Sequence, residues 1–310
     1  MVNMILKILK RYTLFIVMLL GVVTYPWMSK LQFLTPYLIF IMLYLTFCRI
    51  DPAKMRIKKW HLLLLLIQAI GSVCAYFLFM YYDKMLAQGA MLCFLMPTAI
   101  SAAVITGKLG GSVEEQTTYT LLSSMMVAIM VPFVFPLIMH VNQMVASKEF
   151  VESFCAIIIK IFPILIFPFL LAWLTRIVYQ KKTHKKMVLS ALVNSLPFYL
   201  WAFSLTILMA STTRSLVEDE YNSFSAVLLA INALGACVLQ FWVGKRVGDR
   251  YGQHIAAGQA LGQKNTILGI WLAHTYLIPA SALGVAAYIV WQNLFNAYQL
   301  AKFDKRKNNL

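Results

Sequence analysis

Acidic residues are scarce in this sequence, which has 11 Asp and Glu against 27 Lys and Arg. None falls deep inside an apolar stretch. Glu114 and Glu115 begin one such stretch, where Ser112-Val113-Glu114-Glu115 fits a helix capping box. Paired intramembrane aspartates are therefore missing, and so are the GxSxG, HExxH and phosphate-loop motifs. We expect the protein not to be an enzyme.

Cysteine pairs are missing as well. The sequence has five cysteines, and none of them stands in a CxxC spacing. Neither a disulfide framework nor a metal site is indicated by such scattered thiols. We therefore expect no cofactor and no structural metal.

Long polar stretches are the third absence, because only 12% of the residues are charged and 61% are hydrophobic. A water-soluble helical bundle would need polar helix faces, which this sequence does not provide. Most apolar blocks approach or exceed the ~20 residues with which a helix crosses a bilayer. The chain thus predicts an all-α integral membrane protein with ten transmembrane helices. The apolar blocks cover residues 12–29, 33–48, 60–82, 87–107, 113–140, 151–179, 187–211, 223–243, 253–273 and 275–299.

The net charge of +16 follows the predicted topology. Most basic residues lie at the two termini and in alternate loops, whereas the other loops hold only Lys30, Lys84, Lys148 and Arg214. This alternation is the positive-inside pattern, and it predicts a bacterial inner (cytoplasmic) membrane protein with both termini in the cytoplasm. No basic stripe is left over for nucleic acid, so the expected surroundings are the lipid bilayer.

A charged connection at about residues 140–152 divides the ten predicted helices into halves, 1–140 and 141–310. With five helices in each half, the second half must run inverted relative to the first. Inverted repeats are a device of secondary transporters, which bind substrate near mid-membrane where interrupted helices meet.

The fourth predicted helix of each half carries residues that break helices. Pro97 interrupts the first of them, and Gly258, Gly262 and the polar run Gln263-Lys264-Asn265-Thr266 interrupt the second. Ordinary kinks are the alternative interpretation, because Gly and Pro are common in membrane helices. Their matching positions favour two broken helices, 4 and 9, which cross near residues 97–101 and 260–265.

The polar run is part of a wider resemblance. Gly262-Gln263-Lys264-Asn265-Thr266-Ile267-Leu268, Trp291-Gln292-Asn293 and Asn232-Ala233-Leu234-Gly235 resemble motifs of the bile acid:sodium symporter superfamily. Shorter likenesses are Thr98-Ala99, Gly111-x-Val113, Thr120 with Ser123, and Gln68. The resemblance implies a panel of helices 1, 2, 6 and 7, and a core of helices 3–5 and 8–10. It also implies transport of organic anions with two bound sodium ions.

The sequence departs from the family at the sodium sites. The family's glutamate corresponds to Ala260, and a glutamine ligand corresponds to Lys264. Sodium is a hard cation that prefers oxygen ligands, so these changes disfavour its binding. The altered ion site that the resemblance implies comprises Gln68, Ala102, Gln116, Thr120, Ala260, Gln263 and Lys264.

Lys264 offers a substitute for the missing cations. Two sodium ions and one glutamate give a net charge of +1, and one lysine without the glutamate gives the same charge. We therefore predict a sodium-independent secondary transporter of a small organic anion, with a proton- or sodium-coupled symporter and a non-transporting receptor or sensor as alternatives. The residues predicted to contact the substrate are Thr98, Ser101, Lys264, Asn265 and Gln292.

Overall fold

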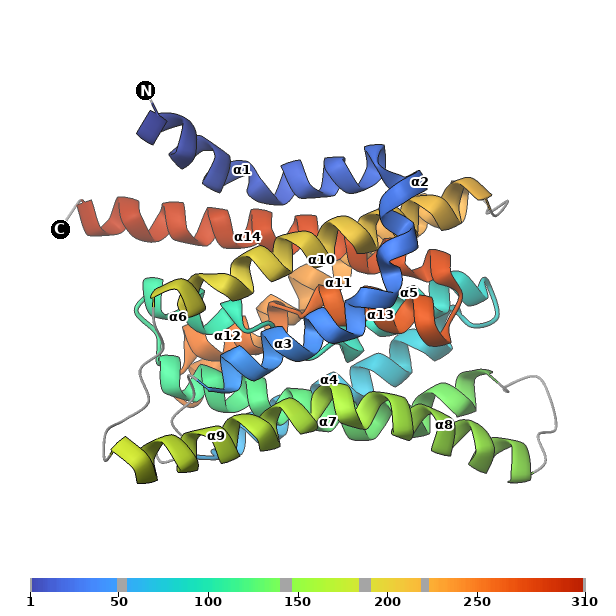
Figure 1. Ribbon diagram of the computed structural model, residues 1–310, viewed down its shortest axis with the longest axis horizontal. Helices are drawn as coiled ribbons and strands as arrows, with labels where there is room; N and C mark the ends of the chain where they lie inside the picture. The colour runs from blue at the N-terminus through green and yellow to red at the C-terminus, as the bar shows by residue number, and fades with distance from the viewer. Residues whose placement is uncertain (1, 49–54, 140–146, 184–190, 219–222, 309–310) are drawn as a thin grey trace. The chain divides into compact units, whose positions relative to one another are not determined.

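A computed structural model describes residues 2–48, 55–139, 147–183, 191–218 and 223–308 (Figure 1). The secondary structure within these ranges is helical, and no strand occurs in them. Six stretches in the described part are long and apolar enough to cross a membrane, as expected for an all-α integral membrane protein. They are Tyr25–Phe47, Lys59–Phe79, Val113–Ile138, Glu149–Lys181, Leu196–Glu218 and Phe224–Asp249.

The chain divides into two compact units, each built from two separate segments. The first unit contains residues 1–49 and 163–221, and the second contains residues 50–162 and 222–310. The expected boundary between sequence halves, at residues 140 and 141, lies outside the described residues.

The first unit is built around α10, which packs against α1 and α3. The hydroxyl of Thr206 on α10 donates to the Val17 carbonyl on α1, with 3.3 Å between the oxygens. The helix α3 also packs against α9, where the hydroxyls of Tyr44 and Thr175 lie 3.1 Å apart. The elements of this unit are α1 (Val2–Val23), α2 (Tyr25–Met28), η1 (Ser29–Leu34), α3 (Thr35–Phe47), α9 (Phe167–Thr183) and α10 (Ala191–Glu218).

The second unit contains shorter helices as well as long ones. Its long helices are α4 (Lys59–Phe79), α7 (Val113–Met139), α11 (Ser223–Asp249) and α14 (Ala282–Asn308, red in Figure 1). Its shorter elements are α5 (Lys84–Leu95), α6 (Ser101–Lys108), α12 (His254–Gly262), α13 (Thr266–Tyr276) and η3 (Pro279–Ser281). Most of α8 (Ser147–Leu165) also belongs here, up to Phe162.

The helices α11 and α12 approach each other closely because small residues line their contact. A Cβ atom on Gly244 of α11 would meet the carbonyl oxygen of Ala257, and it would lie 3.0 Å from the Cα atom of Gly258. A Cβ atom on Gly248, four residues later, would meet the Gln253 carbonyl oxygen just before α12 and would lie 2.8 Å from the Cβ atom of Ala257. Such a pair of glycines four residues apart is a common device for close packing of membrane helices.

This contact predicts opposite effects for two glycine substitutions on α11. Gly244→Ala should lower the midpoint of thermal unfolding, because the added methyl group meets backbone that cannot move aside, and overpacking costs about 1–3 kcal/mol. Gly235→Ala is the matched control, since nothing lies within 4 Å of the position of its Cβ atom. That control should raise stability by about 0.5–1 kcal/mol, as alanine does in a helix. Thermal unfolding of the purified protein in detergent measures the midpoints of both variants. Equal changes of the midpoint in the two variants would contradict the close contact of α11 and α12.

Candidate functional site

Both helix interruptions expected from the sequence are present, and both lie in the second unit. Between α5 and α6, residues 96–100 form a first link, and residues 263–265 form a second link between α12 and α13. Thr98 and Lys264 pair across the two links as an antiparallel bridge. The Ala99 amide donates to the Gln263 carbonyl at 2.9 Å, and the Asn265 amide donates to the Pro97 carbonyl at 2.7 Å. The predicted meeting of the two breaks is therefore confirmed.

The end of α5 leaves carbonyl groups that no later turn of the helix can satisfy. Side chains from the second link and from two other helices supply the missing donors. Lys264 Nζ donates to the Phe94 carbonyl at 3.0 Å, and Gln240 Nε2 on α11 donates to the Cys93 carbonyl at 3.1 Å. Gln68 Nε2 on α4 donates to the carbonyls of Leu95 and Met96, at 3.0 and 2.9 Å.

The end of α12 is satisfied in a similar manner. The hydroxyl of Thr98 donates to the Ala260 carbonyl, and the hydroxyl of Tyr288 on α14 donates to the Gly262 carbonyl at 2.8 Å. Gln292 pairs with the backbone of Lys264: its Oε1 accepts from the Lys264 amide at 2.8 Å, and its Nε2 donates to the Lys264 carbonyl at 3.3 Å. In this conformation the side chains of Thr98 and Gln292 therefore hold the links.

Gln240 and Tyr288 were not among the residues predicted from the sequence. Gln240 also donates to the Tyr288 hydroxyl at 3.2 Å, so the two residues join the ends of α5 and α12. The sequence does indicate that these two residues need hydrogen-bond partners, because Gln240 places an amide and Tyr288 a phenol in otherwise apolar stretches.

Gln68 connects the first link to α7. Its Oε1 accepts from the Tyr119 hydroxyl at 3.0 Å and from the Ser123 hydroxyl at 3.3 Å. The Ser123 oxygen in turn accepts from the Thr98 amide at 3.0 Å. The nitrogen of the Gln68 amide is thus bonded to the carbonyls at the end of α5, and its oxygen is bonded to hydroxyls on α7.

The amino group of Lys264 is deeply buried, since the residue is 1% exposed. Among the described residues, no ion pair joins it to a carboxylate. Its partner is the C-terminal end of α5, where the helix dipole places a partial negative charge of about half an elementary charge. An ammonium group carries three donors, and the Phe94 carbonyl accepts from one of them.

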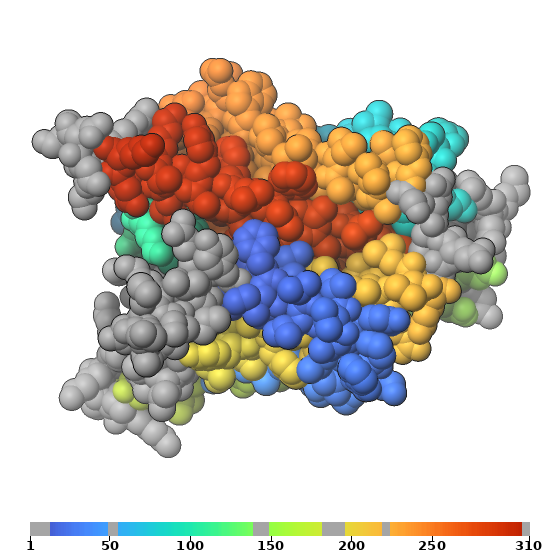
Figure 2. Space-filling model, turned by 90° about the horizontal axis from the view of Figure 1, so that it is seen from above, coloured from blue at the N-terminus to red at the C-terminus, as the bar shows by residue number. Residues whose placement is uncertain are grey.

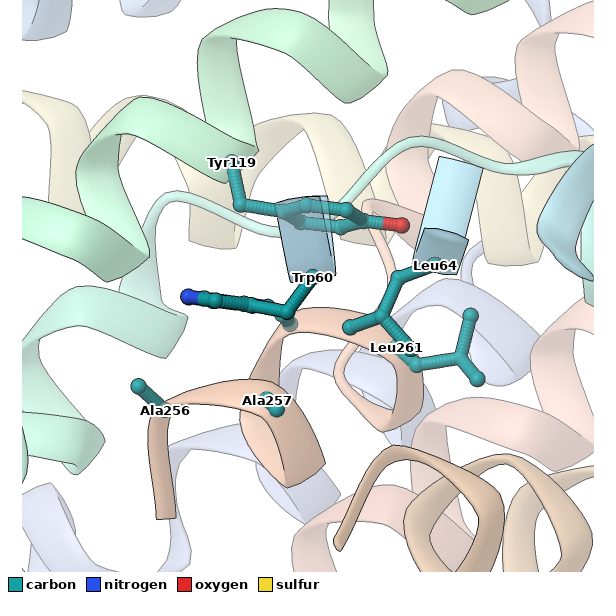
Figure 3. Packing of buried hydrophobic residues seen from close by; sticks show 7 residues of the cluster. Trp60, Leu64, Tyr119, Ala256, Ala257 and Leu261 are labelled. Carbon is teal, nitrogen blue, oxygen red and sulfur yellow. The ribbon is translucent and has the colours of Figure 1, made fainter. Parts of the chain in front are cut away.

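Ala260 lies in an apolar cluster that Figure 3 shows from close by. The rings of Trp60 and Tyr119 stack with 6.1 Å between their centroids, and Leu64 and Leu261 lie beside them. The Ala260 methyl group offers a cation no ligand atom, in contrast to the carboxylate of a glutamate.

The other residues of the expected ion site also lack a carboxylate. Ala102 is fully buried and offers no ligand atom. Gln116 accepts from the Thr106 hydroxyl at 3.4 Å, and the Thr120 hydroxyl donates to the Gln116 carbonyl at 3.0 Å. The buried Gln116 Nε2, a donor, has no hydrogen-bond partner.

Ser101 and Asn265 are the most accessible of the predicted substrate residues. Ser101 is exposed at the start of α6, and Asn265 is half-buried just before α13. Gln263 lies between them and donates to the Ser101 oxygen at 2.8 Å, while its buried Oε1 has no partner. The Asn265 Oδ1 accepts from the Leu268 amide at 3.3 Å, which leaves its amide group as a potential donor.

No protein-family model matches this chain, and no curated protein matches its sequence.

Proposed function

We propose that this protein is a secondary transporter of a small organic anion and that it works without sodium. The observation that carries this proposal is Lys264, a buried lysine at the meeting point of two interrupted helices, without a carboxylate partner in the described residues. Ionisable groups buried in membrane proteins are costly, and they commonly mark the path of a substrate or an ion.

Three sources of positive potential converge at the paired links. Lys264 supplies a full charge, and α6 and α13 both begin at the links. Each helix N-terminus carries a partial positive charge and unpaired amide groups, which favour anions. An organic acid bound there can accept hydrogen bonds from the Ser101 hydroxyl and the Asn265 amide.

The residues at the expected ion site do not fit sodium. A sodium site in a low-dielectric interior is best built from oxygen ligands that include a carboxylate. Here Ala260 presents a methyl group in an apolar cluster, and Lys264 would repel a cation. Lys264 instead replaces a bound cation, because its ammonium group donates a hydrogen bond to the Phe94 carbonyl at the end of α5.

The proposed architecture has ten spans in two inverted repeats, in a bacterial inner membrane with both termini in the cytoplasm. Six helical stretches are long and apolar enough to cross a membrane, and α1, α14 and the interrupted pairs α5–α6 and α12–α13 would bring the number to ten. The separation into two compact units also supports the proposal, because transporters of this kind move one group of helices against another.

A thermal-shift screen of the purified protein against small organic anions tests the proposal. A ligand at 100 times its Kd stabilises the folded state by about 2.7 kcal/mol, so a substrate should raise the unfolding midpoint clearly. We expect equal shifts in sodium chloride and in choline chloride, and none with an uncharged amide analogue of the same acid. A shift that appears only with sodium would favour the sodium-coupled alternative. Binding without uptake into vesicles would favour a receptor.

A further inference from the structure

A basic seam lies on α11 and α14, and on α14 it begins about one turn beyond Gln292. We define it as Lys245 on α11 with Asn296, Gln299 and Lys302 on α14. Lys245 Nζ lies 5.2 Å from the centroid of the Phe295 ring, and the charge of Lys302 acts on Lys245. Positions 295, 299 and 302 share one face of α14, because they are spaced by four and three residues. In Figure 2 the red surface of α14 lies against the orange surface of residues near 250.

The buried wall of the seam contains an unused donor. Asn296 is 4% exposed, and its Oδ1 accepts from Gln259 Nε2 at 2.8 Å and from Gln299 Nε2 at 3.4 Å. Its Nδ2 has no hydrogen-bond partner. A buried donor without a partner costs free energy unless a ligand or water accepts its hydrogen bond.

Asp249, four residues after Lys245 on α11, offsets part of the charge of Lys245, and the two lysines together still leave the seam positive. The nearby Asp249 contacts His254, with 2.6 Å between the Oδ1 and Nδ1 atoms. The seam therefore combines two lysines with a buried amide donor that has no hydrogen-bond partner. This combination is complementary to a phosphate group, which carries negative charge and several acceptor oxygens.

The flanks of the seam fit a lipid. Trp242 is 55% exposed, and the guanidinium group of Arg246 lies over its ring. Tyr298 is 61% exposed, and the amino group of Lys302 lies over its ring. Tryptophan and tyrosine beside basic residues are typical of the membrane interface. Leu239 and Leu294 are also exposed and continue this surface with apolar side chains, on which acyl chains can lie.

We propose that the basic seam binds the phosphate of an anionic phospholipid. The lysines and the Asn296 amide bind the headgroup, and the exposed apolar side chains bind the acyl chains. A free phosphate ion would use the lysines but gain nothing from the apolar flank.

The test is native mass spectrometry of the delipidated full-length protein, titrated with phosphatidylglycerol, with phosphatidylcholine or with inorganic phosphate. We expect saturable binding of phosphatidylglycerol in preference to phosphatidylcholine. Each lysine near a headgroup contributes enough to change affinity about fivefold, so Lys245→Gln with Lys302→Gln should weaken binding about 25-fold. Lys108→Gln, an exposed lysine at the end of α6, is the matched control and should change nothing.

Two results would overturn the proposal. One is an unchanged preference for phosphatidylglycerol in the double variant. The other is equally tight binding of inorganic phosphate, which would indicate a soluble anion as the ligand. If the double variant does not fold, Lys302→Gln alone serves, because Lys302 is exposed; it should weaken lipid binding about fivefold.

Discussion

Lys264→Gln should abolish high-affinity binding of the organic anion while leaving much of the fold intact. The substitution removes the buried charge, and truncating one partner of a buried charge pair costs about 2–5 kcal/mol in binding. The Kd should therefore rise at least about 30-fold. The shorter glutamine also leaves the Phe94 carbonyl without its donor, so a modest fall in the unfolding midpoint should accompany the loss. Isothermal titration with the anion found by screening measures the Kd.

Lys160→Gln is the matched control. Lys160 also lies in a long apolar stretch, on α8, but its side chain is exposed. Its replacement should leave the Kd unchanged. If Lys264→Gln lowered stability but bound the anion as tightly as the native protein, Lys264 would be a helix cap with no role in recognition.

The interruptions could be predicted because their causes are local. Pro97 lacks an amide hydrogen, and Gln263-Lys264-Asn265 is a polar run in an apolar stretch. Each break is therefore caused by a few adjacent residues. Their pairing required one further step, the equivalence of two positions in the two halves of the sequence. The antiparallel bridge between Thr98 and Lys264 follows from that step.

The hydrogen-bond partners of the break could not be predicted in the same way. A broken helix exposes carbonyls, and whichever donor lies nearest in three dimensions satisfies them. Gln240 and Tyr288 do so from other helices, and nothing in their sequence neighbourhoods indicates which carbonyl they reach. For the same reason Thr98 and Gln292 were predicted as substrate ligands, whereas both hold backbone groups of the links.

Ala260→Glu should be the most destabilising of the substitutions considered. Ala260 is fully buried beside Trp60, Leu64 and Tyr119, and an unpaired charge in a membrane interior costs about 3 kcal/mol. Thr98 bonds to the Ala260 carbonyl and pairs with Lys264, so the lysine lies close enough to offset part of this cost. Combining Ala260→Glu with Lys264→Gln removes that compensation and changes the charge at the links from +1 to −1.

The double variant should therefore depend on a cation for its stability. Its carboxylate, with the oxygens of Gln68 and Thr98 nearby, offers the hard ligands that sodium prefers. Exchanging choline chloride for sodium chloride should raise its thermal unfolding midpoint, whereas the native protein should not respond. Ala301→Glu, at an exposed position near the end of α14, controls for the added acid. A native protein that gains as much from sodium as the double variant would show that Lys264 does not replace a cation, because a site already filled by an ammonium group has no place for one.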